Sequence, residues 1–209
     1  MPEPVVGVVL AGGRSSRMGG GDKSLLALGD RTILARVLER LRPQVSDTII
    51  NANGDAARFG VFGLPVVPDD IAGLAGPLAG VHAALVWTKA NIPDARYVVT
   101  VAGDTPFFPP DLVAQFLAAP ERHPSLVVAA SKEGTHPVFG LWPVSLAGKL
   151  EDSLRGGMRK VGMWTREQGA IEVVFPPVRT GKRIVDPFFN INRPEDLTEA
   201  DALLRKDTS

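Results

Sequence analysis

The sequence predicts an α/β protein in which a mostly parallel sheet lies between two layers of helices. Segments with the patterns of strands and of helices alternate along most of the 209 residues. Residues 4–12 and 96–104 are nearly continuous apolar runs, which is typical of strands buried on both faces. Repeated strand–helix–strand units favour a parallel sheet with right-handed crossovers. We therefore expect a three-layer sandwich in which residues 1–209 form a single domain.

The expected elements follow one another in order along the chain. Strands are expected at 4–12, 47–53, 63–70, 96–104 and 125–131. Helices are expected at 33–41, where the apolar residues share one face and Pro43 follows, at 77–89, which begins with Pro77, and at 109–119. After residue 131 the pattern changes to short segments that look like a smaller appendage. Residues 189–197 then lead into a last helix.

The composition excludes several kinds of site and partner. The chain has no cysteine, which excludes disulfides, cysteine nucleophiles and thiolate metal sites, and its three histidines are scattered. Its 23 basic and 23 acidic residues give no net charge, which argues against a general nucleic-acid surface. The longest apolar stretch near the N-terminus is too short to span a membrane, and no basic segment precedes it as in a signal peptide. We expect a soluble, cytoplasmic protein.

Polar, loop-forming clusters follow four of the expected strands. They are LAGGRSSRMGGGDK at 10–23, NANGD at 51–55, VPDD at 67–70 and GDTP at 103–106. In open parallel sheets, ligands bind beyond the carboxyl ends of the strands. The sequence therefore predicts that these clusters meet at one ligand-binding edge.

The glycine-rich loop after the first strand has the composition of a phosphate site. Glycines allow backbone N–H groups to approach an anion closely, and Arg14, Arg17 and Lys23 add positive charge. The alternative is a plain surface loop between a strand and a helix. A Walker loop needs glycine before its lysine, but Asp22 stands there, and the dinucleotide fingerprint G-x-G-x-x-G is absent. The pattern favours a nucleoside triphosphate held by a long basic loop.

The acidic and amide residues of the other clusters each have a structural alternative. Asp104 ends the strand at 96–104 and is either a turn or helix-capping residue or a ligand of a hard cation such as magnesium. Asn51 and Asn53, and likewise the pair Asp69 and Asp70, are common turn formers. An amide can also donate and accept in the plane of a base, and a carboxylate can accept the N1–H and N2–H donors of guanine. His136, which precedes a proline, is more typical of a structural histidine than of a catalytic one.

The loop resembles a known signature. LAGGRSSRMGGGDK is similar to L-A-G-G-x-S-x-R-M-G-x-x-K of nucleotidyltransferases, with one more residue before the lysine. Further matches follow in the same order, namely NAN at 51–53, PDD at 68–70, GPLAG at 76–80, GDTPFFPPDL at 103–112, HP at 136–137 and FNINRPEDL at 189–197. Together they cover nearly the whole chain, which most closely resembles the molybdenum cofactor guanylyltransferases. Related cytidylyltransferases tend to carry L-A-A-G, so Gly12 favours guanine.

The resemblance implies a Rossmann-like fold of the nucleotide-diphospho-sugar transferase type. It further implies transfer of GMP from GTP to the terminal phosphate of molybdopterin carrying molybdenum, with release of pyrophosphate. The GTP-binding half would be about 1–130 and the acceptor-binding half about 131–209. Implied protein partners are the molybdenum insertion protein and the molybdoenzyme apoproteins or their chaperones.

The same resemblance implies roles for individual residues. Asp104 would hold Mg²⁺, and Lys23 and Arg17 would stabilise the charge that grows on pyrophosphate. The implied nucleotide-binding residues are Leu10, Ala11, Gly12, Gly13, Lys23, Asn51, Asp70, Gly76, Gly80 and Asp104. The candidates for contact with the pterin are Arg155, Arg159, Lys160, Asn190 and Asn192.

Three other functions remain open from the sequence. The nearest is a nucleotidyltransferase with another base or acceptor, such as cytidylyl transfer to molybdopterin or to a sugar-alcohol phosphate. A second is a carrier that binds GTP and pterin without catalysis, against which Lys23 and Asp104 argue. A third, a dinucleotide-dependent dehydrogenase, lacks its fingerprint.

Overall fold

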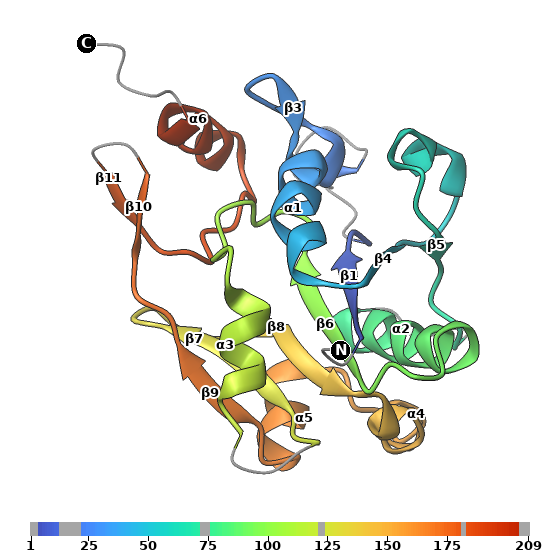
Figure 1. Ribbon diagram of the computed structural model, residues 1–209. Coiled ribbons are helices and arrows are strands. Elements are labelled where there is room, and N and C mark those ends of the chain that lie inside the picture. Colours follow the sequence, from blue (N-terminus) through green and yellow to red (C-terminus); the bar gives the residue numbers. More distant parts are fainter. Residues whose placement is uncertain (1–3, 13–21, 72–75, 121–123, 181–182, 205–209) are drawn as a thin grey trace.

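The computed structural model describes residues 4–12, 22–71, 76–120, 124–180 and 183–204. A seven-stranded sheet forms its centre, in the order β5-β4-β1-β6-β8-β7-β9 (Figure 1). The strands are β1 (Val5–Leu10), β4 (Asp47–Asn51), β5 (Val66–Val67), β6 (Tyr97–Ala102), β7 (Val127–Ser131), β8 (Gly134–Pro143) and β9 (Ile171–Val174). Strand β8 runs antiparallel to its neighbours β6 and β7, and the other pairs are parallel. The mostly parallel sheet that the sequence predicted is therefore confirmed.

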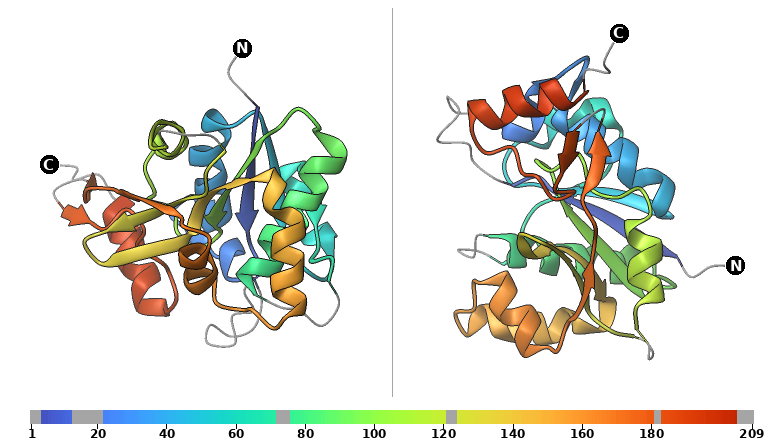
Figure 2. Two further views of the ribbon diagram at one scale, coloured as in Figure 1. Left: turned by 90° about the horizontal axis from the view of Figure 1, so that it is seen from below. Right: turned by 90° about the vertical axis from the view of Figure 1, so that its left-hand side faces the viewer.

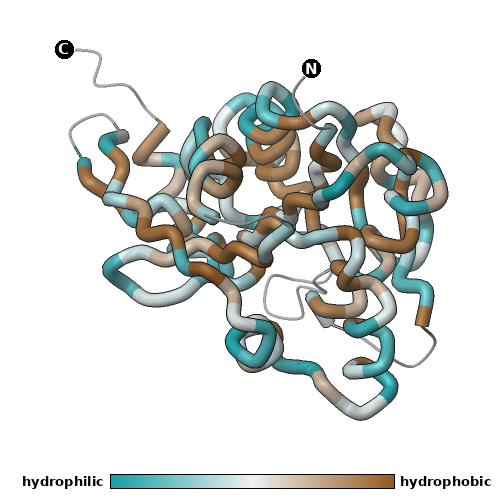
Figure 3. Tube along the Cα trace, turned by 60° about the horizontal axis from the view of Figure 1, so that its bottom comes forward, coloured by the Kyte–Doolittle hydropathy of each residue, from teal (hydrophilic) through white to brown (hydrophobic). Residues whose placement is uncertain are grey.

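Helices cover both faces of this sheet (Figure 2). Helices α1 (Ile33–Leu41) and α3 (Leu112–Ala118) bury their apolar side chains against one face. Helices α2 (Pro77–Asn91), α4 (Ala147–Arg155) and α5 (Val161–Glu167) cover the other. The hydrophobic parts of the chain gather in the central strands and on the inner sides of the helices, as Figure 3 shows. This is the expected three-layer sandwich.

Smaller elements complete the chain around these layers. Helix α6 (Pro194–Leu204) packs against the short hairpin of β2 (Ala27–Leu28) and β3 (Arg31–Thr32) through a third apolar cluster. Strands β10 (Val178–Thr180) and β11 (Arg183–Val185) pair with each other. The 3-10 helices are η1 (Lys23–Leu25), η2 (Arg42–Gln44), η3 (Ala56–Phe62) and η4 (Val144–Leu146). Among the described residues, no helix is long and apolar enough to cross a membrane.

The expectation of a smaller appendage after residue 131 is wrong, because β8 and β9 belong to the central sheet. The reason lies in the packing of β8. Its Phe139 joins the core beneath α1 and α3, and its Trp142 joins the core beneath α2 and α4. Trp142 also stacks on Trp164 of α5, with ring centroids 5.9 Å apart. A strand buried on both faces lies inside the sheet.

The topology brings the carboxyl ends of β4, β1 and β6 to one edge of the sheet. The register pairs Leu10 with Asn51 on one side and with Ala102 on the other. The polar clusters that follow these strands therefore start side by side, as the sequence predicted. The first part of β8 reaches this edge as well, because β8 runs antiparallel to β6.

Candidate active site

A cavity of about 350 Å³ lies at this edge of the sheet. It is lined by Leu10, Gly12, Asn51, Asn53, Asp69, Gly76, Pro77, Ala102, Asp104, Val138 and Asn190. These residues come from the ends of β1, β4 and β6, from the turn after β5, from the start of α2, and from two segments beyond residue 131. Both halves of the chain therefore contribute to one pocket.

A lysine, a carboxylate and an amide meet at one place on this edge. The Lys23 Nζ atom lies 2.5 Å from Asp104 Oδ2 and donates a hydrogen bond to Asn192 Oδ1 over 2.6 Å. The Thr105 hydroxyl donates to the other carboxylate oxygen, Asp104 Oδ1, over 3.1 Å. The segment that carries Asn192 is held by a backbone bond from Ile191 N to Asp104 O. Three stretches of chain that are far apart in sequence thus converge on one charged centre.

The Asp104 carboxylate suits a divalent cation of the kind the sequence predicted. Its oxygens are hard donors, and its side chain keeps 20% of its surface exposed. The described residues contain no group of three or more histidine or acidic side chains that could hold a metal ion by themselves. Mg²⁺ commonly binds through one or two carboxylates, with water and substrate phosphates as the remaining ligands. A single, partly exposed carboxylate fits that mode of binding.

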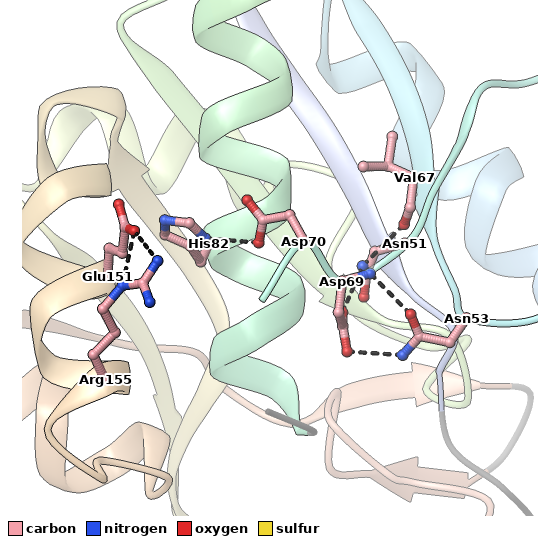
Figure 4. Close-up of polar contacts among 8 residues, drawn as sticks. All are labelled: Asn51, Asn53, Val67, Asp69, Asp70, His82, Glu151 and Arg155. Carbon is pink, nitrogen blue, oxygen red and sulfur yellow. Dashed lines mark hydrogen bonds and ion pairs between the residues drawn. The ribbon is translucent and has the colours of Figure 1, made fainter. Parts of the chain in front are cut away.

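A second polar network, the amide network, is formed by Asn51, Asn53 and Asp69, which line the same cavity (Figure 4). The Asn51 amide Nδ2 donates to Asp69 Oδ1 over 3.1 Å and to the Val67 carbonyl over 3.0 Å. Asn53 Nδ2 donates to Asp69 Oδ2 over 2.8 Å, and Asn53 Oδ1 accepts from the Asp69 backbone N–H over 2.8 Å. Asn53 and Asp69 did not enter the predicted set of site residues, yet both line the cavity.

Asp70, which did enter the predicted set, has a different environment. Its Oδ1 lies 2.8 Å from His82 Nδ1 of helix α2, and it is not among the residues that line the cavity. In Figure 4 the Asp69 and Asp70 side chains point to opposite sides of the turn. The two adjacent carboxylates therefore have different partners, and only Asp69 lines the cavity.

The two predicted site glycines near the start of α2 differ in their roles. Gly76 precedes α2 with a φ of +123°, a backbone conformation that other residues rarely adopt, and it lines the cavity. Gly80 is buried inside α2 and lies against the Asn51 side chain. A Cβ atom at Gly80 would overlap Asn51 Oδ1 and lie 2.9 Å from Asn51 Cγ. Gly80 therefore makes room for a cavity residue and does not line the cavity itself.

The first loop is described at both of its ends. Leu10 and Gly12 line the cavity, whereas Ala11 is buried and donates its N–H to the Asn51 carbonyl over 2.9 Å. The predicted phosphate-binding residues Gly13, Arg14 and Arg17 lie outside the described residues. At the far end, Lys23 opens η1 at the charged centre.

An arginine that the sequence did not single out links this loop to the amide network. Arg58, from η3, forms an ion pair with Asp22, the residue before Lys23. Its Nη2 also donates to the Asn53 carbonyl over 2.7 Å. No motif marks Arg58, because its partners lie in separate segments and only the fold brings them together.

Val138 reaches the cavity through an irregularity in β8. The register of β7 and β8 shifts between Val128 and Ala129, which marks a bulge on β8. The Thr100 hydroxyl donates to the Val138 carbonyl over 2.6 Å and accepts from Trp142 Nε1 over 2.7 Å. This buried network holds the β8 backbone at Val138, which lines the cavity.

The five candidates for contact with the pterin divide into two groups. Asn190 lines the cavity, and Asn192 bonds to Lys23. The three basic candidates lie at the end of α4 and just beyond it, and two of them make local contacts. Arg155 bonds to Glu151 one turn earlier, which holds the pKa of that exposed carboxyl below its usual value, and Arg159 donates to the carbonyls of Leu154 and Met158. Lys160 is exposed and precedes α5.

His136 has the structural environment that the sequence favoured. Its Nε2 lies 2.8 Å from the Ser131 hydroxyl, and its ring packs at a tilt against Phe188 with centroids 4.5 Å apart. Burial lowers the pKa of His136, an effect that Asp186 and Glu133 oppose. No described contact joins it to the residues that line the cavity.

The chain is similar to known proteins over most of its length. The family model described as a MobA-like NTP transferase domain matches residues 7–170. A protein of Mesorhizobium japonicum named molybdenum cofactor guanylyltransferase is 46% identical over 215 residues, with all of both chains covered.

Solved structures show the same fold. A molybdopterin-guanine dinucleotide biosynthesis protein A from Archaeoglobus fulgidus superposes with a TM-score of 0.70 at 23% identity, covering 95% of this chain and 97% of that one. A Mycobacterium tuberculosis protein, solved as a complex with manganese, gives a TM-score of 0.66 at 20% identity and covers 95% and 98% of the two chains. From the family match and the close relative together, the chain belongs to the MobA-like NTP transferase family, among the molybdenum cofactor guanylyltransferases.

Proposed function

We propose that this protein transfers GMP from GTP to the terminal phosphate of molybdopterin that carries molybdenum. An oxygen of the pterin phosphate attacks the α-phosphorus of GTP, the bond between the α- and β-phosphates breaks, and pyrophosphate leaves. The observation that carries the proposal is the meeting of Lys23, Asp104 and Asn192 beside a cavity that Asn51, Asn53 and Asp69 also line. The family membership and the name of the relative support the same reaction.

In this proposal the amide network binds the guanine base. The Asp69 carboxylate accepts from both asparagines, and it keeps further lone pairs for the N1–H and N2–H donors of guanine. Asn51 is buried except for the cavity, so it has few alternative positions. Of the two aspartates, the proposal assigns the base to Asp69, because Asp70 is paired with His82.

The charged centre binds the phosphates in this proposal. Lys23 exchanges its contact with Asp104 for the phosphates of GTP, where an ammonium group offsets their charge. Asp104 and the substrate phosphates would hold a divalent cation, for which we propose Mg²⁺. The Mycobacterium tuberculosis structure of the same fold is a complex with another divalent cation, manganese. When bound, such an ion lowers the energy of the negative charge that develops in phosphoryl transfer.

The chain itself supplies positioning and charge, and no covalent intermediate is required. The pterin phosphate is already ionised at neutral pH, so no general base is needed to generate the nucleophile. Asn190 lines the cavity beside Asp104, and Asn192 contacts Lys23, so both are placed to orient the acceptor next to the nucleotide. The nucleotide half would then be about residues 1–130 and the acceptor half about 131–209.

A thermal-shift comparison of nucleotides tests this proposal. GTP, CTP, UTP, ATP and NAD are added in turn, each with and without Mg²⁺. A ligand at a hundred times its dissociation constant adds about 2.7 kcal/mol to the free energy of unfolding. We expect stabilisation by GTP above the others, stronger with Mg²⁺. A preference for CTP would move the proposal to cytidylyl transfer, and no response to any nucleotide would refute it.

A further inference from the structure

Helix α2 carries a buried histidine that the proposed reaction does not use. His82 lies in the second turn of α2, and 2% of its surface is exposed. Its Nδ1 lies 2.8 Å from Asp70 Oδ1, while its Nε2 is buried without a hydrogen-bond partner among the described residues. Burying an unpartnered polar atom is unfavourable. An apolar side chain would avoid this cost, which the bond to Asp70 offsets. The carboxylate of Glu151, in α4, also lies near the His82 ring (Figure 4).

The turn after β5 is therefore held from two sides (Figure 4). On one side, the Asp69 side chain and backbone bond to Asn51 and Asn53 at the cavity. On the other side, the Asp70 carboxylate reaches across to His82 of α2. Because Asp69 and Asp70 are adjacent, a rotation of the backbone at Asp70 also turns the Asp69 carboxylate. The bond to His82 opposes that rotation.

We propose that His82 is a positioning residue for base selectivity. It fixes Asp70, and through Asp70 it fixes the direction in which Asp69 presents its free lone pairs to the base. This inference rests on the proposed function, because it takes guanine as the base that Asp69 contacts. Selectivity for guanine needs both donors of its edge to meet the carboxylate at once, which requires a fixed carboxylate plane.

The test compares GTP with ITP, which lacks the 2-amino group of guanine. Dissociation constants of both nucleotides are measured with Mg²⁺ for the wild-type protein, for His82→Leu and for His82→Asn. In asparagine the Nδ2 atom is bonded to Cγ, as Nδ1 is in histidine, so it keeps the donor in place. We expect His82→Leu to weaken GTP binding about tenfold, which is the scale of one hydrogen bond to a charged group. The dissociation constants of GTP and ITP should also become more similar. His82→Asn should retain most of the preference for GTP over ITP.

A second variant removes the other partner of the same bond, Asp70, which is more exposed than His82. The Asp70 side chain keeps 34% of its surface exposed, so Asp70→Ala leaves the core intact. It should weaken GTP binding as His82→Leu does, and the double variant should lose little more, because both changes break one interaction. Losses that simply add in the double variant would contradict the proposal.

Thr88→Val is the matched control within the same helix. Thr88 is fully buried in α2, and its hydroxyl, like His82 Nε2, is buried without a partner among the described residues. We expect wild-type affinities for both nucleotides from this variant. If His82→Leu lowers the melting temperature but keeps the wild-type ratio of GTP to ITP affinity, the histidine is only structural and the inference is wrong. A wild-type protein without a preference for GTP would instead refute the proposed function.

Discussion

Replacing Gly80 by alanine tests whether the position of Asn51 depends on the close approach of helix α2. The new Cβ atom would overlap Asn51 Oδ1 and lie 2.9 Å from Asn51 Cγ and 3.1 Å from Leu10 Cδ2. Asn51 and Leu10 both line the cavity. The substitution therefore displaces a cavity residue without changing the chemistry of any polar group.

The expected magnitude comes from two opposing effects. Alanine in place of glycine inside a helix stabilises by about 0.5–1 kcal/mol, because the unfolded chain loses freedom. Overpacking of a filled site costs about 1–3 kcal/mol. Gly148→Ala, in α4, supplies the control, because a Cβ atom there meets no atom within 4 Å. Gly80→Ala should therefore be about 1–3 kcal/mol less stable than Gly148→Ala.

Urea unfolding and GTP titration of both variants provide the assay. Displacement of Asn51 breaks its bond to Asp69, so GTP binding should weaken about tenfold in Gly80→Ala and stay at the wild-type level in Gly148→Ala. If Gly80→Ala proves as stable as Gly148→Ala and binds GTP like the wild type, the close approach has no consequence. The reasoning from Gly80 to the nucleotide site would then be refuted.

Three further predictions concern single residues. Asp104→Asn should lower kcat about 100-fold or more while GTP affinity changes far less, because the carboxylate acts mainly on the charge that develops in the transition state. Equal losses of kcat in steady-state kinetics and of GTP affinity in binding would contradict this role. Lys23→Met should weaken GTP binding about tenfold. Because the ammonium group no longer pairs with Asp104, the nucleotide-free variant should also bind Mn²⁺ more tightly, as measured by electron paramagnetic resonance. Unchanged affinities for both GTP and Mn²⁺ would show that Lys23 does not belong to the site. Since burial holds the pKa of His136 below 6.5, unfolding takes up a proton, so stability should fall as the pH drops below about 6.5. His136→Phe should flatten that slope in urea unfolding, and an identical slope in both proteins would count against it.

The central sheet was predictable because its strands are marked by the sequence itself. The apolar run at Val5–Leu10 is buried along nearly its whole length, and the five large apolar residues of α1 are all buried. The strand expected at 63–70 shrinks to Val66–Val67, because β5 is the edge strand and pairs with β4 alone. Strand β8 was misjudged because its place in the sheet depends on contacts with both cores, which no local pattern reveals.

The sequence was enough to predict at which edge of the sheet the candidate site lies and which types of residue form it. The convergence of Lys23, Asp104 and Asn51 on one rim follows from the parallel order of the strands. The choice between Asp69 and Asp70 could not be made from the sequence, because it depends on how the turn after β5 is held by α2. Likewise, a single histidine in an apolar helix gives no signal until its partner is known.

The most direct test of the proposed reaction follows the α-phosphate of GTP. The protein is incubated with Mg²⁺, molybdopterin carrying molybdenum, and either GTP or CTP labelled at the α-phosphate, and the pterin product is separated from the nucleotide. The account predicts that label from GTP reaches the pterin together with release of pyrophosphate, and that Asp104→Asn abolishes nearly all of this transfer. Transfer of label from CTP in preference to GTP, or tight GTP binding without any transfer, would contradict it.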